Sequence, residues 1–289
     1  MRGTASDMAT RLVDALRETL GGWREDLPAA WLPVLGDVAL GFDDCDPSLK
    51  IEAWEPIFPA RRGWVFPGAP AGAHMLRAFD GIEPDAVRCV VLGQDPYPEP
   101  GFATGRAFEA GNVAAWRELD KMFSKSVRAY MQQICAARTG RPELATSFEA
   151  WPGLLREIEA GTVGLEPPGD VADRWVREGV LLLNSSLTLS RFQVAVDPHQ
   201  SRGHLPVWRP LIQAVLRHFA ASGRPIVYLG FGDAAADNLR LAGLETPPAP
   251  QATIQRAHPA FADALFSLGN PFIACNRHLA DAGLRPIDW

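Results

Sequence analysis

Long apolar runs are missing from this sequence. No window approaches the ~20 apolar residues that a membrane-spanning helix needs, and the N-terminal segment MRGTASDMAT lacks the apolar core of a signal peptide. The overall composition is that of a folded protein, because 47% of the residues are apolar and can fill a sizeable core. We therefore expect a cytoplasmic protein that does not contact a membrane.

Cysteine is scarce as well. The four cysteines of the 289-residue chain lie far apart in the sequence and form no Cys-x-x-Cys pair. Two of them, Cys89 and Cys275, have apolar neighbours, which indicates buried free thiols in a reducing compartment. We expect neither a zinc site nor an iron–sulfur cluster.

The chain also lacks an excess of positive charge. Its net charge is −6, and even the more basic stretch 199–289 carries only 8 Lys/Arg against 6 Asp/Glu. This balance argues against a protein that coats nucleic acid broadly. A nucleic acid would meet a local patch, in which backbone N–H groups and hydroxyls contact phosphates alongside Arg and Lys.

The hydrophobic pattern predicts an α/β fold. Short apolar runs occur at 87–92, 180–184, 225–230 and 252–257. Helical patterns lie between and after them, at about 112–138, 145–160, 206–221, 233–243 and 270–283. Short buried strands that alternate with helices predict a parallel sheet covered on both faces. We expect a three-layer α/β/α fold around a central four-stranded parallel sheet.

The length allows one large domain or two small ones, at roughly 100–200 residues per domain. Because no linker interrupts the regular succession of predicted strands, we expect a single domain over residues 1–289 with a core at 85–289. Leucines at a spacing of four predict a helix over 7–23. The rest of the segment 1–80 is rich in Pro, Gly and Trp, and we interpret it as an N-terminal extension of short helices and loops.

Polar residues follow three of the predicted strands. Asp95 comes after the first strand, Asn184 ends the second, and His258 follows the fourth. In a sheet of this kind, ligands bind beyond the carboxyl ends of the strands. We therefore expect these three side chains to converge in one cleft, although they are far apart in the sequence.

Each of the three residues also has an ordinary structural explanation. Asn184 is of a residue type that often caps a helix, and an Asp before Pro, as at Asp95, is typical of a turn. His258 is explained equally well as a buried histidine with satisfied hydrogen bonds. Their occurrence at three strand ends argues against coincidence, but it does not name a substrate.

Two segments closely resemble motifs of the family 1 uracil-DNA glycosylases. GQDPYPEPGFATGRAF at 93–108 resembles the family's water-activating motif, and WVREGVLLLNSSLTLS at 175–190 resembles its second motif. The His-Pro pair at 258–259 matches the start of the family's leucine loop, and PIDW at 286–289 resembles its C-terminal motif. The similarity covers roughly residues 85–289, and it points away from uracil glycosylase branches with other first motifs or cysteine-bound clusters.

The resemblance implies a uracil-DNA glycosylase, a hydrolase of base-excision repair that requires no metal or cofactor. Such an enzyme pulls the target base out of the stack and reads its edge in a pocket. Asn184 then pairs with O4 and N3–H of uracil, and Phe108 stacks on the base. Tyr97 occupies the position that blocks the methyl group of thymine.

The same resemblance assigns the chemistry and the DNA contacts. Asp95 stabilises the sugar cation and orients or deprotonates water. His258 donates to uracil O2, preferably as a neutral imidazole, and Gln94 contributes backbone contacts to the base. The residues expected to contact DNA are Ser126, Pro259, Phe261 and Leu265.

The chain departs from the family pattern on the loops that face DNA. Pro98 stands where the family has a His, and the family's Pro-rich loop is missing from 112–128, where Ser126 is the nearest equivalent of a phosphate-contacting residue. The family's Gly-Ser loop corresponds to Gly230-Phe231-Gly232, without the hydroxyl. These changes predict that the protein binds DNA differently from other members of the family.

The leucine loop is also rebuilt. The family's phosphate-contacting Ser corresponds to Ala260, and its wedge Leu falls on Ala262, which is too small to fill the gap left by a flipped base. Phe261 and Leu265 flank this position, so we expect one of them to be the wedge. The alternative is that the apolar residues of this loop pack against the body of the protein.

Three functional hypotheses are consistent with the sequence. The leading hypothesis is a monomeric uracil-DNA glycosylase that acts on single- or double-stranded DNA containing uracil and leaves an abasic site. The altered phosphate contacts support a second hypothesis, a protein that binds uracil or abasic sites in DNA with weak turnover. A third, an α/β enzyme for free nucleosides, has only the acidic charge in its favour.

Overall fold

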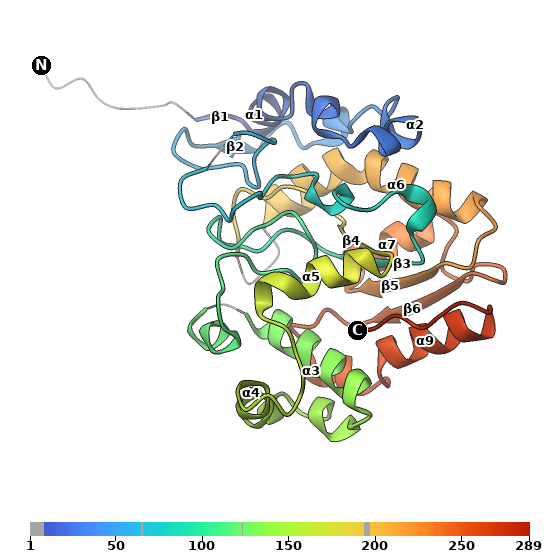
Figure 1. The fold of residues 1–289 in the computed structure, drawn as a ribbon. Helices are drawn as coiled ribbons and strands as arrows, with labels where there is room; N and C mark the ends of the chain where they lie inside the picture. The colour runs from blue at the N-terminus through green and yellow to red at the C-terminus, as the bar shows by residue number, and fades with distance from the viewer. Residues whose placement is uncertain (1–8, 65, 123, 194–196) are drawn as a thin grey trace, which may run out of the picture.

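The structure is a computed structural model of the chain and describes residues 9–64, 66–122, 124–193 and 197–289. Four parallel strands form its centre in the spatial order β4-β3-β5-β6 (Figure 1). The strands are β3 (Cys89–Gly93), β4 (Val180–Asn184), β5 (Val227–Phe231) and β6 (Ala252–Arg256). They coincide with the four apolar runs of the sequence, so the predicted parallel sheet is confirmed.

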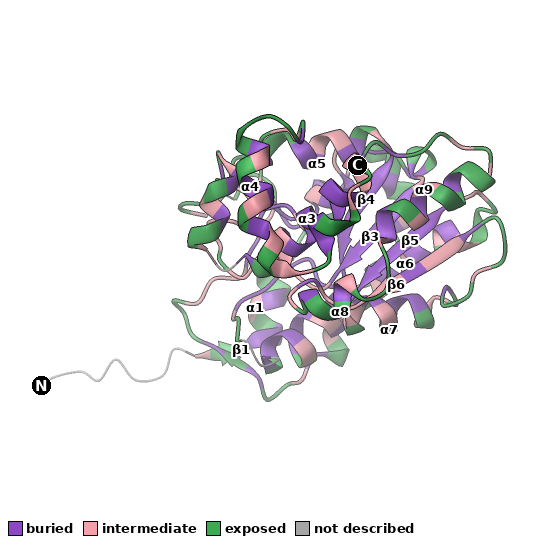
Figure 2. Cartoon of the chain, turned by 90° about the horizontal axis from the view of Figure 1, so that it is seen from below, coloured by how far each residue is buried: buried purple, intermediate pink, exposed green. Residues whose placement is uncertain are grey.

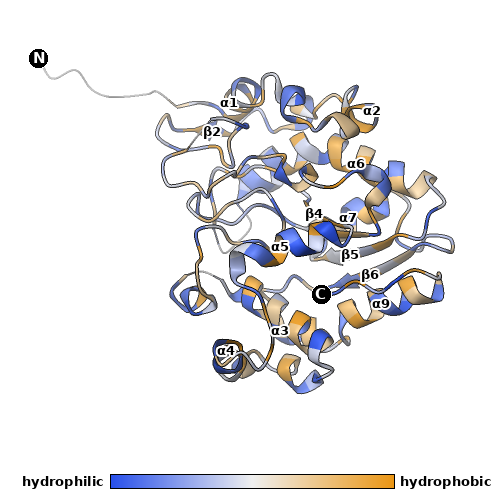
Figure 3. Cartoon of the chain, viewed as in Figure 1, coloured by the Kyte–Doolittle hydropathy of each residue, from blue (hydrophilic) through white to orange (hydrophobic). Residues whose placement is uncertain are grey.

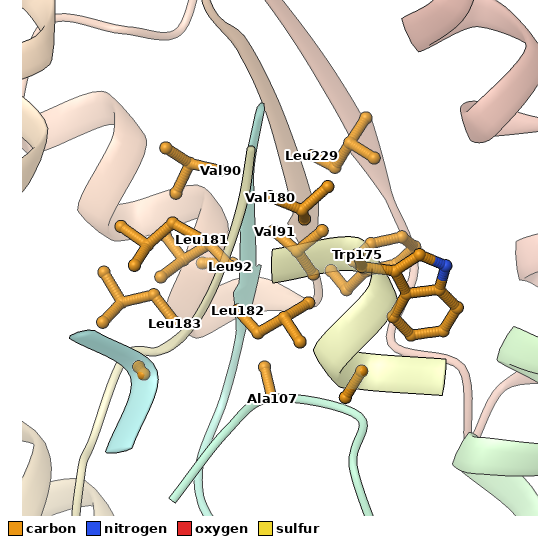
Figure 4. Packing of buried hydrophobic residues seen from close by; sticks show 14 of the residues in the cluster. Val90, Val91, Leu92, Ala107, Trp175, Val180, Leu181, Leu182, Leu183 and Leu229 are labelled. Atoms are coloured by element: carbon orange, nitrogen blue, oxygen red, sulfur yellow. The ribbon is translucent and has the colours of Figure 1, made fainter. Parts of the chain in front are cut away.

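Burial explains why these segments form strands. Every residue of β3, β4 and β5 is buried (Figure 2), and side chains such as Val90 and Leu182 have no exposed surface. Strands that are apolar on both faces need a cover on both sides. Figure 4 shows one such contact, in which Trp175 lies beside the side chains of β3 and β4. The edge strand β6 is less buried, and only Ile254 within it is classed with the buried core residues.

Helices lie on both sides of the sheet, which gives the three layers. Figure 1 shows α6 on one side, with α2 beyond it, and α3 and α9 on the other. Around α4 and α9, hydrophobic and hydrophilic residues alternate as in helices that have one buried face (Figure 3). The helices are α1 (Leu12–Thr19), α2 (Leu32–Leu35), α3 (Lys125–Thr139), α4 (Trp151–Glu159), α5 (Pro168–Arg177), α6 (Leu205–Ala221), α7 (Asp233–Leu241), α8 (Ala262–Phe266) and α9 (Pro271–Asp281).

The N-terminal segment packs against the core. Two short strands, β1 (Thr10–Arg11) and β2 (Lys50–Ile51), pair in antiparallel fashion within it. The buried indole of Trp31 donates to the backbone oxygen of Ile82 at 2.8 Å, and the side chain shares one hydrophobic core with the sheet. Among the described residues, no helix has the length and apolar character needed to cross a bilayer.

Some helix boundaries differ from those expected. α3 begins at Lys125 rather than near residue 112, because a 3₁₀ helix at Trp116–Lys121 is followed by an extended backbone at Met122 (φ −130°, ψ 167°). α5 was not predicted, nor was the π-helical turn Gln200–His204 that leads into α6. The π-helical turn is held by contacts with distant parts of the chain, whereas α5 buries one face, with Val171, Ala172, Trp175 and Val176.

Candidate active site

The carboxyl ends of β3 and β4 are tied together by backbone hydrogen bonds. Gly93 pairs with Asn184 in the sheet register. The N–H groups of Ser185 and Ser186 then donate to the carbonyl oxygens of Gly93 and Gln94, both at 2.9 Å, and the Ser185 hydroxyl adds a second bond to Gly93 at 2.8 Å. The loop that carries Asp95 is therefore fixed against the end of the neighbouring strand.

Gly93 makes room for the base-binding residues predicted from the sequence. A Cβ atom at this position would lie 2.5 Å from Oδ1 of Asn184 and 3.4 Å from the ring of Phe108. Only a glycine allows the two side chains to approach this spot together. Asn184 is 3% exposed, and no residue that the structure describes forms a hydrogen bond with its side-chain amide.

Phe108 is held in an unusual backbone conformation by aromatic neighbours. Its φ of 58° is uncommon for a bulky residue. One face of its ring stacks on Tyr130, with centroids 4.3 Å apart and planes 8° from parallel, and Phe231 of β5 meets it edge-on at 5.2 Å. Since Tyr130 covers one face, a planar ligand has the opposite face on which to stack.

Asp95 lies half-buried on the loop after β3. Burial raises the pKa of its carboxyl group to about 7, and a hydrogen bond from the Gln94 side chain acts in the opposite direction. The side-chain amide of Gln200 also donates to Oδ2 of Asp95. A carboxyl group with a pKa near neutrality is suited to take a proton from water.

His258 follows β6 and is held in one tautomer. The backbone N–H of Ala260 donates to its Nδ1 at 3.2 Å, so in the neutral ring the hydrogen is on Nε2. Burial lowers the pKa of the imidazole and favours this neutral form. Gly232 lies against the ring from the end of β5, where a Cβ would come within 3.0 Å of His258. Phe231, next to Gly232, contacts Phe108, which connects His258 to the predicted base-binding residues.

Tyr97 is half-buried between the site loop and a small apolar cluster. It packs against the cluster of Phe58, Ala103 and Leu189, and its ring meets Phe102 at 5.7 Å. Burial raises the pKa of its phenol, which therefore stays protonated. Its exclusion of thymine remains a prediction.

The residues expected to contact DNA have different surroundings. Ser126 lies in the first turn of α3, and Pro259 is buried beside His258. Phe261 is 68% exposed, whereas Leu265 is 0% exposed. The expectation that Leu265 contacts DNA is therefore wrong. The reason is the short helix α8, which turns Ala262 and Leu265 toward the core and leaves Phe261, just before it, on the surface.

Gln200 is a site residue that the sequence analysis missed. It belongs to the polar segment DPHQSRGH at 197–204, between β4 and α6. The cluster of polar residues and two histidines in that connection was a usable signal, but nothing in it indicates a contact with Asp95. In the described part of the chain, no group of three or more His, Cys, Asp or Glu side chains is placed to hold a metal ion.

The fold and the site together define a class of protein. A side-chain amide, a stacking ring, a neutral imidazole and a half-buried carboxyl group at the end of a parallel sheet are the parts of an enzyme that excises a planar base from its sugar. Comparison with known proteins narrows this class. The chain belongs to the uracil-DNA glycosylase family.

Curated relatives support this assignment. A uracil-DNA glycosylase from Parafrankia is 34% identical over 223 residues, which cover 76% of this chain and 80% of the relative. One from Bordetella petrii is 30% identical over 278 residues, which cover 94% and 90%. No protein-family model matches the chain.

Solved structures agree in fold. The UNG structure from Nitratifractor salsuginis superposes with a TM-score of 0.56 at 25% identity and covers 89% of this chain and 92% of the other. Mimivirus uracil-DNA glycosylase gives a TM-score of 0.57 over 100% and 96% of the two chains. Its identity is only 13%, so this second likeness concerns the fold alone.

Proposed function

We propose that this protein hydrolyses the N-glycosidic bond of a flipped-out deoxyuridine in DNA, releases uracil and leaves an abasic site. Membership of the uracil-DNA glycosylase family supports this function. The observation that carries it is the approach of the Asn184 amide and the Phe108 ring to the same spot above Gly93. That spot offers one edge contact and one stacking contact to a single planar base.

The chemistry follows from the groups around this spot. When the bond between C1′ and N1 breaks, its electron pair leaves with uracil and positive charge develops on the sugar. The Asp95 carboxylate stabilises that charge, and it accepts the proton of the water that adds to C1′. The Nε2–H of His258 donates to O2 of uracil, where negative charge develops.

The amide of Asn184 gives the site its choice of base. Uracil presents an acceptor at O4 next to a donor at N3–H, and a side-chain amide offers the complementary donor and acceptor. Cytosine presents the opposite pattern at these two positions. An unpaired polar group in the pocket would make its binding unfavourable.

We further propose that the protein acts as a cytoplasmic monomer on uracil-containing DNA, single- or double-stranded. Its four cysteines are all free and buried, which agrees with a reducing compartment. Repair of duplex DNA needs a residue that fills the gap left by the base, and the exposed Phe261 fits this need.

The test is uracil release from a labelled oligonucleotide with one deoxyuridine, measured with substrate in excess. Matched oligonucleotides with thymidine or deoxycytidine at the same position serve as controls. We expect many turnovers on the uracil substrate and none on the controls. Tight binding of uracil or abasic DNA with less than one turnover would reject this proposal in favour of a lesion-binding protein.

A further inference from the structure

Gln200 reaches Asp95 from a separate part of the chain. It is the first residue of the π-helical turn Gln200–His204 and is 5% exposed. Its Nε2 donates to Oδ2 of Asp95 across 105 positions of sequence. An ionised carboxyl group only accepts hydrogen bonds, so the amide nitrogen of Gln200 is the matching partner for the charged form.

The segment that carries Gln200 is anchored on its N-terminal side. The backbone N–H groups of Gln200 and Ser201 donate to the carbonyl oxygen of Asp197, both at 3.1 Å, and the N–H of His199 donates to the Asp197 carboxylate at 2.8 Å. The Nε2 of His199 lies 3.0 Å from the carbonyl oxygen of Lys50. Since a carbonyl only accepts, this nitrogen carries the hydrogen and the Nδ1 of the neutral ring is an acceptor.

That tautomer determines the next hydrogen bond. The hydroxyl of Ser190 lies 2.9 Å from Nδ1 of His199, so it donates its single hydrogen there. It must then accept from Nε2 of His204, which is also 2.9 Å away. Burial lowers the pKa of His199, and it lowers that of His204 to about 3, so both rings are neutral as this pattern requires.

The chain of hydrogen bonds ends in the core. With its hydrogen on Nε2, His204 accepts at Nδ1 from the hydroxyl of Thr188 at 2.9 Å. The indole of Trp208 in turn donates to Thr188 at 2.7 Å. In this series of hydrogen bonds, each side-chain atom can act only as the donor or only as the acceptor described. His199, just before the π-helical turn, and His204, its last residue, are therefore locked in orientation, and so is the turn that they bound.

We propose that Gln200 is a positioning residue for Asp95, held in place by the two locked histidines. This inference rests on the proposed function. The donor from Gln200 stabilises the carboxylate over the protonated acid and fixes the plane of the carboxyl group. The family resemblance assigned no role to this position, and a π-helical turn is a frequent mark of a functional segment.

Neighbouring titratable groups do not stabilise the carboxylate of Asp95. The same elements carry the charged side chains Glu99, Asp197, Arg202 and Arg256, none of which shifts the pKa of Asp95. The other titratable groups there include Tyr97 on the same loop, His258 after β6, and His199 beside Gln200. Burial keeps all three uncharged at neutral pH, because it raises the pKa of the phenol and lowers those of the imidazoles. The protonation of Asp95 is thus set by burial and by uncharged donors, of which Gln200 is one.

The test is the single-turnover rate of uracil release as a function of pH for wild type and Gln200→Leu. Losing the donor should move the rising limb of the pH profile to higher pH by about one unit, with a rate loss of about fivefold at pH 7, where the ionised fraction of Asp95 falls from about one half to about one tenth. Gln213→Leu is the matched control. Gln213 is also a buried amide, but it bonds to Asn238 between α6 and α7, so its loss should leave the limb in place.

Several outcomes overturn the proposal. A folded Gln200→Leu protein whose pH profile rises at the same pH as that of wild type overturns it. A lower rate without a shift of the pH profile also overturns it, because that result would indicate a purely structural role. If Gln200→Leu does not fold, the pH profile of Gln200→Glu tests the proposal instead. Its second carboxyl group should raise the apparent pKa still further, and an unchanged limb again overturns the proposal. A wild-type protein that releases no uracil would instead reject the proposed function.

Discussion

At the scale of single residues, Asp95 shows how the site balances opposing influences. Burial favours the protonated acid, whereas a hydrogen bond from the amide of Gln94 favours the carboxylate. The result is a pKa of about 7, close to the range in which the residue must act as a base. The same carboxyl group would be fully ionised at neutral pH on an open surface.

Replacing Asp95 by Asn keeps the shape of the side chain but removes the charge and the base. We expect the single-turnover rate of uracil release to fall by roughly 10²–10⁴-fold, the usual contribution of a positioned general base. Binding of uracil-containing DNA should be largely retained, which a filter or fluorescence titration would check. A rate near that of wild type would exclude Asp95 from the mechanism.

Asn184→Asp should change the choice of base. A carboxyl group can accept from the exocyclic amine of cytosine, which the Asn184 amide cannot do in its uracil-reading orientation. We expect the variant to release cytosine from a matched oligonucleotide, while wild type releases none. If base choice does not change, Asn184 does not read the base edge.

Tyr97→Ala should open the pocket to thymine. Discrimination of one methyl group by packing is worth about 1–3 kcal/mol, and a rigid wall can exceed this. Tyr97 packs against Phe102 and the Phe58 cluster, so the truncated protein must first be shown to be folded by circular dichroism. Thymine release by a folded variant is the expected result, and its absence would contradict a steric role for Tyr97.

At the scale of elements, the segment from His258 to Gly269 separates exposed from buried apolar residues. α8 places Ala262 and Leu265 against the core, whereas Phe261 and Leu268 are 68% and 61% exposed. Phe261 lies next to the backbone that holds His258, since its own N–H donates to the His258 carbonyl at 2.8 Å. Position and exposure therefore make Phe261 the candidate wedge.

Phe261→Ala should slow cleavage of duplex DNA more than cleavage of a single strand. Only the duplex requires base-pair opening, and an apolar wedge offsets an unstacking cost of a few kcal/mol. Leu268→Ala is the matched control, because it removes an equally exposed apolar side chain from the same segment. An equal duplex-to-single-strand ratio in Phe261→Ala and wild type would show that another element holds the flipped state.

At the scale of the whole molecule, the raised pKa of Asp95 links activity to stability. An Asp in the unfolded chain titrates near pH 4, whereas Asp95 in the folded protein titrates at about 7. Between these values the folded state binds more protons than the unfolded state. Asp95 therefore lowers the free energy of unfolding as pH rises from about 4 to 7.

Asp95→Asn should accordingly stabilise the protein most where the wild-type carboxyl group is charged. We expect its Tm to exceed that of wild type at pH 8, and the difference to shrink at pH 5, in thermal melts of both proteins. The buried His199 and His204 have lowered pKa values, which make both proteins less stable in acid. Their contributions cancel when the Tm values of the two proteins are compared at the same pH. A Tm difference that does not vary with pH would contradict the raised pKa.

The sheet, and the residues at the ends of its strands, could be predicted from the sequence alone. Strands such as Val180–Asn184 are apolar throughout, and that property predicts burial in a parallel sheet whatever their neighbours. Because the carboxyl ends of parallel strands share one edge, the positions of Asp95 and Asn184 followed from their places after two strands. The motifs that contain them also indicated the family.

The support of these residues could not be predicted, because it depends on contacts between distant segments. The contact of Gln200 with Asp95, the stack of Tyr130 under Phe108 and the burial of Leu265 join segments that no local pattern connects. A π-helical turn and a five-residue helix leave little periodicity to read. Which side chain is exposed and which faces the core depends there on packing between distant elements, and local propensity is too weak to set it.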